Sequence, residues 1–140
     1  VKKYIIENIF NSSIVRGSDD DFKLIFNTDN HRDTFSIIRK TGCKILIYTS
    51  GDTNVEFISE EFELSIPVKK IKPVSTIGAG DTFNAGIIYG LFKNNINTSD
   101  LNKVDSGLWK SIIKNAITFG TQVCRSYDNY LSEEFAERNR

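Results

Sequence analysis

Residues 44–48 of the sequence, Lys-Ile-Leu-Ile-Tyr, form an almost continuous apolar run that ends in the small polar segment Thr49-Ser50-Gly51. A strand with one face in water alternates apolar and polar side chains, whereas a strand covered on both faces does not need to. The run therefore predicts a strand that is buried on both faces of a sheet.

Helical and strand-like patterns interleave along the rest of the chain. Apolar spacing predicts helices at residues 2–11, from residue 19 onward, and at residues 31–41, 80–93 and 108–127. Further strands are expected at residues 13–16, 54–59 and 62–68, with Pro67 at an edge or a strand end. Gly42 is expected to stop the third helix. Because strands alternate with helices, the predicted fold class is α/β.

Two of these helices carry explicit expectations about burial. Ser18 is expected to cap the helix that begins in the acidic run Asp19-Asp20-Asp21. This helix is expected to bury four apolar side chains: Phe22, Leu24, Ile25 and Phe26. Residues 80–93 are expected to place five on one side: Phe83, Ile87, Ile88, Leu91 and Phe92.

The composition is that of a folded soluble protein and argues against several classes of function. The 140 residues, 39% of them hydrophobic and 26% charged, predict one domain spanning residues 1–140, or a piece of a domain. Eighteen basic residues balance eighteen acidic ones, which argues against nucleic acid or an anionic membrane as a partner. No apolar run approaches the ~20 residues that span a bilayer. Cys43 and Cys124 lie far apart in the sequence, which favours two reduced thiols in a cytoplasmic protein over a disulfide. The chain starts at Val1 without Met, which suggests an internal piece of a longer protein.

Residues 75–86, Ser-Thr-Ile-Gly-Ala-Gly-Asp-Thr-Phe-Asn-Ala-Gly, carry the clearest chemical signal. Small residues before a helix let a ligand approach the backbone amides, and the free N–H groups of the first helical turn form an anion site. Asp81 would repel a phosphate there unless it takes a proton from the nucleophile that attacks the phosphate. Alternatively, Gly78-Ala79-Gly80 is a flexible turn and Asp81 an ordinary helix charge.

Residues 76–86 resemble the C-terminal signature D-T-x-G-A-G-D-x-F of the ribokinase-like (PfkB) family of carbohydrate kinases. Residues 13–21 resemble the family's strand and N-x-x-E element, and residues 47–51 resemble its T-x-G strand end. The order and spacing match, so the resemblance covers essentially the whole chain but only the C-terminal half of the family's chain. It implies the nucleotide-binding half of a three-layer α/β/α sandwich, without most of the sugar-binding residues.

The resemblance also implies the residues that would catalyse transfer. Asp81 would be the base that deprotonates the acceptor hydroxyl, and the amides of Gly78, Ala79 and Gly80 would form the anion hole for the transferred phosphoryl group. The family's N-x-x-E organises Mg²⁺, and here it reads Ser18-x-x-Asp21. Asp21 would then act at the magnesium ion, or it is simply a first-turn helix charge.

Nucleotide contacts are implied in two further places. Thr49 and Gly51 would lie along ATP, near its phosphates and ribose. The helix at residues 108–127 would form a wall of the adenine pocket, with Asn115 or Gly120 as the contact. The apolar residues of this helix also suit ordinary packing, and both interpretations can hold together.

Besides Ser18 and Asp21, two further places depart from the family pattern, and one residue falls outside it. Ser75 replaces the Asp that opens the family motif and that helps to coordinate a monovalent cation in many relatives, so little activation by K⁺ is expected. The second glycine that follows T-x-G in the family is replaced in this chain, with Asn54 nearby, which alters the local turn but no catalytic group. His31, the single histidine, is expected to be a surface helix residue.

The resemblance predicts an ATP-dependent sugar kinase of the fructokinase or ribokinase type, which transfers the γ-phosphoryl group of ATP to a sugar hydroxyl with Mg²⁺. The expected partners are the sugar, ATP or ADP, the N-terminal half of the same kinase and a second copy in a homodimer; alone, this half is expected to be inactive. The alternative is a non-catalytic nucleotide-binding or regulatory module of the same fold, which Ser18 and Ser75 favour.

Overall fold

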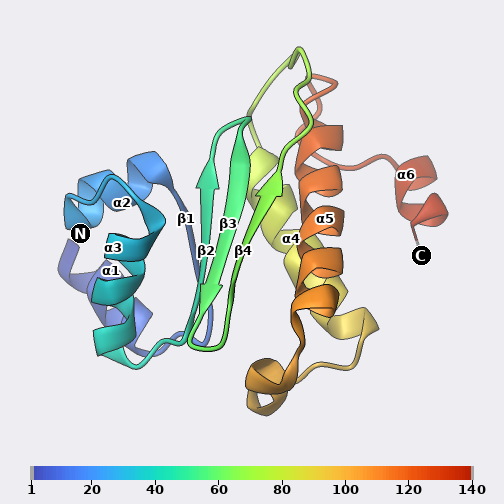
Figure 1. Cartoon of the computed structure of the whole chain (residues 1–140). Helices are drawn as coiled ribbons and strands as arrows, with labels where there is room; N and C mark the ends of the chain where they lie inside the picture. Colours follow the sequence, from blue (N-terminus) through green and yellow to red (C-terminus); the bar gives the residue numbers. More distant parts are fainter. Residues whose placement is uncertain (1, 140) are drawn as a thin grey trace. The chain divides into compact units, whose positions relative to one another are not determined.

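The computed structural model describes residues 2–139, and the chain divides into two compact units, Val1–Lys69 and Lys70–Arg140. Helices and strands interleave along the sequence, as Figure 1 shows by colour and label, which confirms the predicted α/β class. Within residues 2–139, no helix combines the length and the apolar character that crossing a membrane requires.

The first unit contains three α-helices, a 3-10 turn and a four-stranded sheet. In chain order they are α1 (Lys2–Phe10), β1 (Val15–Ser18), α2 (Asp19–Phe26), α3 (His31–Ile38), the 3-10 helix Arg39–Thr41, β2 (Ile45–Ser50), β3 (Asn54–Ser59) and β4 (Glu63–Pro67). The strands lie in the order β1-β2-β3-β4, with β1 parallel to β2 and the other two pairings antiparallel. Pro67 ends a strand that has one neighbour among the described residues, as predicted.

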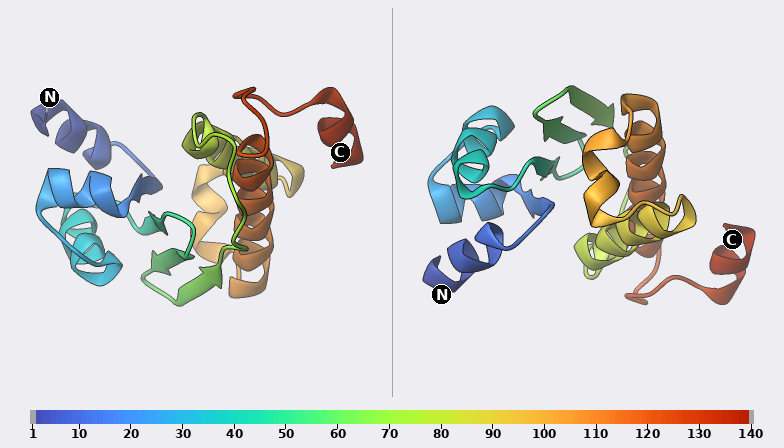
Figure 2. Two further views of the ribbon diagram at one scale, coloured as in Figure 1. Left: turned by 90° about the horizontal axis from the view of Figure 1, so that it is seen from above. Right: turned by 90° about the horizontal axis from the view of Figure 1, so that it is seen from below.

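The core of the first unit lies between the sheet and its three helices, which cover one face of it (Figure 2). Leu46 and Tyr48 alternate along β2 toward this face, and Phe22 of α2 stacks on Tyr48 with ring centroids 5.5 Å apart. Five of the six residues of β2 are buried, which confirms the prediction from the apolar run.

Two expectations for this unit are wrong in detail. The first strand covers Val15–Ser18 rather than residues 13–16, because pairing with β2 begins at Val15 opposite Leu46. Leu24 is 85% exposed. It lies two residues after Phe22, and at 3.6 residues per turn this spacing places the two side chains on opposite sides of α2.

The second unit is helical. It contains α4 (Ala79–Lys93), the 3-10 helix Thr98–Lys103, α5 (Ser106–Val123) and α6 (Glu133–Arg138). Helices α4 and α5 run antiparallel and approach closely at glycines: a Cβ built at Gly86 would lie 2.6 Å from the Cα of Ala116, and one built at Gly90 would lie 2.8 Å from the Cγ2 of Ile112. Their backbones can approach this closely because glycine has no side chain.

The expected apolar side of α4 is only partly correct. Phe83 and Ile87 are buried, whereas Ile88 and Phe92 are 67% and 79% exposed. The contact with α5 follows Phe83, Gly86 and Gly90, so the side of α4 that is buried includes two glycines that a count of apolar residues overlooks. Helix α5 is shorter than expected, ending at Val123, and α6 was not predicted.

Candidate functional site

The turn that opens α4 has a set of backbone donors on partly exposed residues. Gly78 is the N-cap residue and adopts a left-handed conformation with φ of 79°, and no side chain caps the helix. The amide of Ala79 donates to the carbonyl oxygen of Thr76 at 3.2 Å. The amides of Gly80 and Asp81 follow in the first turn, where a helix has no carbonyl four residues earlier to accept from them. These two donors, with the positive end of the helix dipole, suit an anion.

Asp81 is the third residue of α4, and its side chain is exposed beside these donors. The next residue, Thr82, is buried, and its hydroxyl donates to the carbonyl oxygen of Gly78 at 2.8 Å while its amide donates to the same oxygen at 2.9 Å. The turn is therefore fixed from inside the helix, and Asp81 is the member of the motif with an accessible carboxylate. This arrangement can hold an anion and accept a proton at one place.

The segment before the turn is attached to the end of α5. The amides of Val74 and Ser75 donate to the carbonyl oxygen of Cys124 at 2.8 and 3.4 Å. The Ser75 hydroxyl accepts from the amide of Ile77 at 3.2 Å, so it supports the local turn at the position where a carboxylate was expected. Burial raises the pKa of the Cys124 thiol, which is free, as is Cys43.

The two candidate adenine contacts on α5 differ in their surroundings. Gly120 is buried, and a Cβ built there would lie 3.1 Å from the carbonyl oxygen of Ala79 and 3.5 Å from the Cβ of Phe83. Asn115 is exposed. Gly120 thus packs directly beside the anion turn, while Asn115 has a side chain that is open to a ligand.

Thr49 and Gly51, the predicted nucleotide residues of the first unit, lie at the end of β2. Thr49 is buried, and its hydroxyl accepts from Nη2 of Arg16 at 3.1 Å and donates to the carbonyl oxygen of Gly17 at 3.3 Å. Gly51 is exposed in the turn to β3 with φ of 53°. The sequence analysis did not predict that Arg16 contacts Thr49. The signal that could have indicated it is a charged residue inside a predicted strand.

Asp21 closes a capping box at the start of α2. Its Oδ2 accepts from the amide of Ser18 at 2.9 Å and from the Ser18 hydroxyl at 2.8 Å, and its own amide donates to the Ser18 hydroxyl. The hydrogen bonds from Ser18, together with the charge of Arg16, lower the pKa of Asp21. No group of three or more His, Cys, Asp or Glu side chains able to hold a metal ion occurs within residues 2–139. The predicted capping of α2 by Ser18 is confirmed, and the magnesium role of Asp21 stays a prediction.

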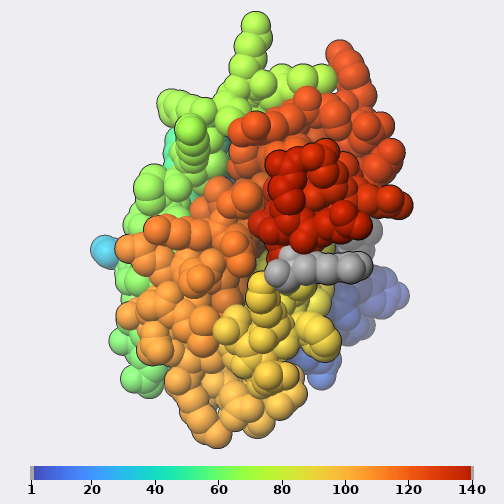
Figure 3. Space-filling view, turned by 90° about the vertical axis from the view of Figure 1, so that its right-hand side faces the viewer, coloured from blue at the N-terminus to red at the C-terminus, as the bar shows by residue number. Residues whose placement is uncertain are grey.

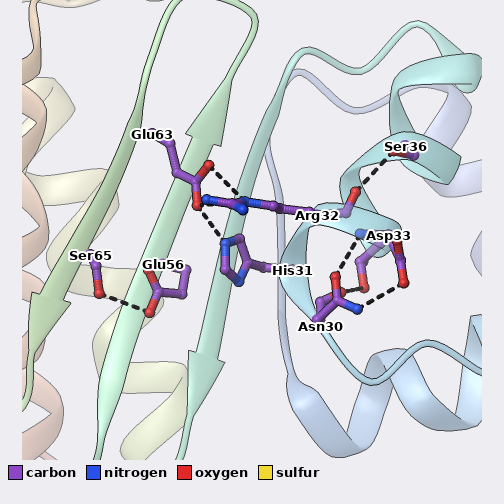
Figure 4. Close-up of polar contacts among 9 residues, drawn as sticks. Asn30, His31, Arg32, Asp33, Ser36, Glu56, Glu63 and Ser65 are labelled. Carbon is purple, nitrogen blue, oxygen red and sulfur yellow. Dashed lines mark hydrogen bonds and ion pairs between the residues drawn. The ribbon is translucent and has the colours of Figure 1, made fainter.

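His31 is half-buried and paired, so it is more than the surface residue that was expected. Its Nε2 lies 2.6 Å from Oε1 of Glu63 in β4, and Nε of Arg32 lies 3.2 Å from the other oxygen of Glu63 (Figure 4). These contacts, the hydrogen bond from His31 first, lower the pKa of Glu63. The cluster joins the start of α3 to the sheet and belongs to the structure of the first unit.

Comparison with known proteins gives a consistent result. Residues 2–122 match the family described as pfkB family carbohydrate kinase. The chain is 30% identical over 87 residues to a fructokinase of Rhizobium leguminosarum bv. trifolii, which is 62% of this chain and 27% of that protein. The chain thus spans about a quarter of the length of this relative.

Two solved structures share the fold. The aminoimidazole riboside kinase of Salmonella enterica superposes with a TM-score of 0.75 at 25% identity, over 89% of this chain and 40% of that one. A fructokinase of Xylella fastidiosa with bound ATP gives a TM-score of 0.82 at 14% identity, over 91% of this chain and 41% of that one. Both are ribokinase-like kinases, which confirms the predicted fold class. The chain belongs to the pfkB family of carbohydrate kinases.

Proposed function

We propose that this chain supplies the nucleotide-binding part of an ATP-dependent sugar kinase, which transfers the γ-phosphoryl group of ATP to a sugar hydroxyl. The observation that carries the proposal is the start of α4, where the left-handed Gly78 turn leaves the amides of Gly80 and Asp81 beside the exposed Asp81 carboxylate. Relatives named fructokinase and aminoimidazole riboside kinase support a sugar or a riboside as acceptor. The bound ATP named for the Xylella fastidiosa structure supports ATP as donor.

In the proposed reaction, Asp81 accepts the proton of the acceptor hydroxyl as its oxygen forms a bond to the γ-phosphorus. The bond between that phosphorus and the bridging oxygen breaks, and ADP leaves. The amides of the Gly78–Gly80 turn stabilise the negative charge on the transferred group, a contribution that is typically worth ~3 kcal/mol per donor. Of these amides, that of Ala79 must exchange its bond to Thr76 for a bond to the phosphoryl group.

Asp21 is the residue that we propose to act at Mg²⁺. Both hydrogen bonds from Ser18 use Oδ2 of Asp21, which leaves Oδ1 for a water molecule of a hydrated magnesium ion. Carboxylate oxygens are the ligands that magnesium prefers, so the residue fits the ion. Magnesium bound to ATP would neutralise phosphate charge.

The remaining contacts and partners are proposed on the same basis. Thr49 and Gly51 would line the nucleotide, and Asn115 or Gly120 would contact the adenine. The N-terminal part of the kinase would supply the sugar site, and a homodimer is a further proposed assembly. The proposed location is the cytoplasm, where the two free thiols would stay reduced. Because Ser75 has no carboxylate, we expect little activation of the transfer reaction by K⁺.

The proposal is tested first by a thermal-shift titration with Mg²⁺-ADP. A ligand that binds only the folded chain raises its melting temperature as the concentration passes Kd, so a saturable rise is expected. Asp81→Asn should bind ADP at least as tightly, because it removes a negative charge beside the phosphates, but should lose at least ~100-fold in transfer rate in the complete kinase. A well-folded chain with no rise contradicts the nucleotide site. If Asp81→Asn leaves the transfer rate unchanged, Asp81 is not the catalytic base but an ordinary helix charge.

A further inference from the structure

The chain after α5 returns to the turn that opens α4. A Cβ built at Gly78 would lie 3.1 Å from the carbonyl oxygen of Asn129 and 3.2 Å from its Cβ. Asn129 lies beyond residue 122, where the match to the family ends, so the family comparison gives this contact no role. The Gly78 turn is thus covered by a segment that is distant in the sequence.

This segment is fixed at both of its ends within the second unit. At its start, the carbonyl oxygen of Cys124 accepts from the amides of Val74 and Ser75. At its end, α6 packs on α5 through Phe135, whose ring meets that of Phe119 edge-on at 5.5 Å. Figure 3 faces this side of the unit and shows the C-terminal segment in red against the orange of α5 and the yellow of α4.

Helix α4 holds the same end of the segment. The hydroxyl of Tyr89 donates to the carbonyl oxygen of Asn139 at 2.7 Å, and the Tyr89 ring stacks on Phe119 with centroids 5.8 Å apart. One ring contact, Phe135 on Phe119, and one hydrogen bond, from Tyr89 to Asn139, therefore anchor the segment on the two helices. Asn129 lies between these anchors in the sequence.

We propose that residues 125–139 form a brace that, through its contact at Asn129, holds Gly78 in its left-handed turn and keeps the first amides of α4 in place. The inference rests on the proposed function, since it assigns the brace to the turn that would bind the phosphates. A turn built on glycine samples many conformations when nothing restricts it. A neighbour that orders the turn beforehand lowers the entropy that is lost when an anion binds there. The brace thus supplies the preorganisation that an anion hole requires.

The proposal is tested by amide hydrogen exchange of the full chain without nucleotide. The amides of Ala79 and Thr82 are the reporters, because they donate to Thr76 and Gly78 within the turn. Phe135→Ala removes the anchor of α6 and should accelerate exchange at both reporters roughly tenfold more than in the middle of α4, since local opening is governed by local contacts. Phe92→Ala is the matched control, because it removes the same type of side chain from α4 at a position where the ring is 79% exposed. This variant should leave exchange at both reporters unchanged.

A second variant keeps the test decisive if Phe135→Ala does not fold. Tyr89→Phe removes only the hydrogen bond to Asn139 and keeps the ring stack, so a smaller acceleration at the same two amides is expected. Unchanged exchange at Ala79 and Thr82, or acceleration that is equal throughout α4 and α5, overturns the brace. Weaker Mg²⁺-ADP binding in the variants, in step with faster exchange, supports its role in binding. If the unaltered chain binds no Mg²⁺-ADP, the proposed function fails, while the exchange data still decide whether the brace exists.

Discussion

Gly86 of α4 lies against Ala116 of α5 so closely that a Cβ built on the glycine would be 2.6 Å from the Cα of the alanine. No rotation of a side chain can relieve that distance, because the atom opposite belongs to the backbone. The two helices therefore meet backbone to backbone at this point. Their contact sets the position of the whole helix whose first turn carries Asp81.

We predict that Gly86→Ala lowers the free energy of unfolding by about 1–3 kcal/mol, the usual cost of forcing extra volume into a packed site. Gly90→Ala is the matched control, because its added methyl meets the Ile112 side chain, at 2.8 Å from Cγ2, rather than backbone. Its packing cost should be smaller, so the gain in helix propensity, about 1 kcal/mol and common to both variants, should offset more of the cost at Gly90 than at Gly86. Urea unfolding of both variants checks the order. Equal losses would contradict the backbone contact.

The capping box of α2 gives a second prediction. Ser18→Ala should lower the stability of the chain by about 0.5–2 kcal/mol, because it removes the acceptor for the Asp21 amide. Asp20→Ala is the control, since Asp20 lies in the same first turn and outside the box. The loss should be the same with and without Mg²⁺, because the cap needs no metal. A loss from Ser18→Ala that appears only when Mg²⁺ is present would contradict a cap that stabilises the metal-free chain.

The sequence was most informative where a local pattern and the tertiary contacts agree. The run at residues 44–48 predicted a buried strand, and β2 is buried along nearly its whole length. Ser18 predicted a helix start, and it caps α2. In both cases the deciding forces act within a few residues: the capping bonds of one turn, and the apolar character of one strand.

The features that could not be predicted depend on residues distant in sequence. Ile88 and Phe92 look like core residues, but α5 packs along the glycines of α4, and the two apolar side chains are left exposed. The pairing of His31 with Glu63 joins α3 to β4, and no local pattern indicates it. The contact of Asn129 with Gly78 is of the same kind. Motif reasoning located the turn at Gly78 but not its neighbour.

The contacts of Glu63 predict a dependence of stability on acid. The hydrogen bond from His31 and the neighbouring Arg32 lower the pKa of Glu63 in the folded chain. Between this lowered pKa and the ordinary value of 4.5, the unfolded chain therefore binds more protons than the folded chain. The stabilisation is fully present above the ordinary value of 4.5 and is lost as the pH falls through the lowered pKa. Glu63→Gln should therefore be less stable than the unaltered chain near neutral pH, and the difference should shrink below pH 4.5.

Urea unfolding from pH 6 to pH 3, a range set around the ordinary carboxyl pKa, measures this difference directly. Glu61→Gln is the control, because Glu61 is exposed, lies two residues away in the sequence and is not part of the cluster. A gap between Glu63→Gln and the unaltered chain that stays constant with pH would show that packing, rather than the ionised carboxylate, supplies the stabilisation.

Two glycines with left-handed backbone, Gly51 and Gly78, allow the cost of backbone strain to be measured apart from the cost of a clash with the C-terminal segment. Gly51 and Gly78 have φ values of 53° and 79°, but an added Cβ at Gly51 meets nothing within 4 Å, whereas at Gly78 it meets Asn129. Both alanine variants bear the left-handed conformation, which costs about 1–2 kcal/mol. We predict that Gly51→Ala loses only this amount in urea unfolding, whereas Gly78→Ala loses at least about 1 kcal/mol more because the Asn129 backbone must also shift. If the two losses were equal, the segment would yield freely to the new methyl group, and a segment that yields freely cannot hold the turn.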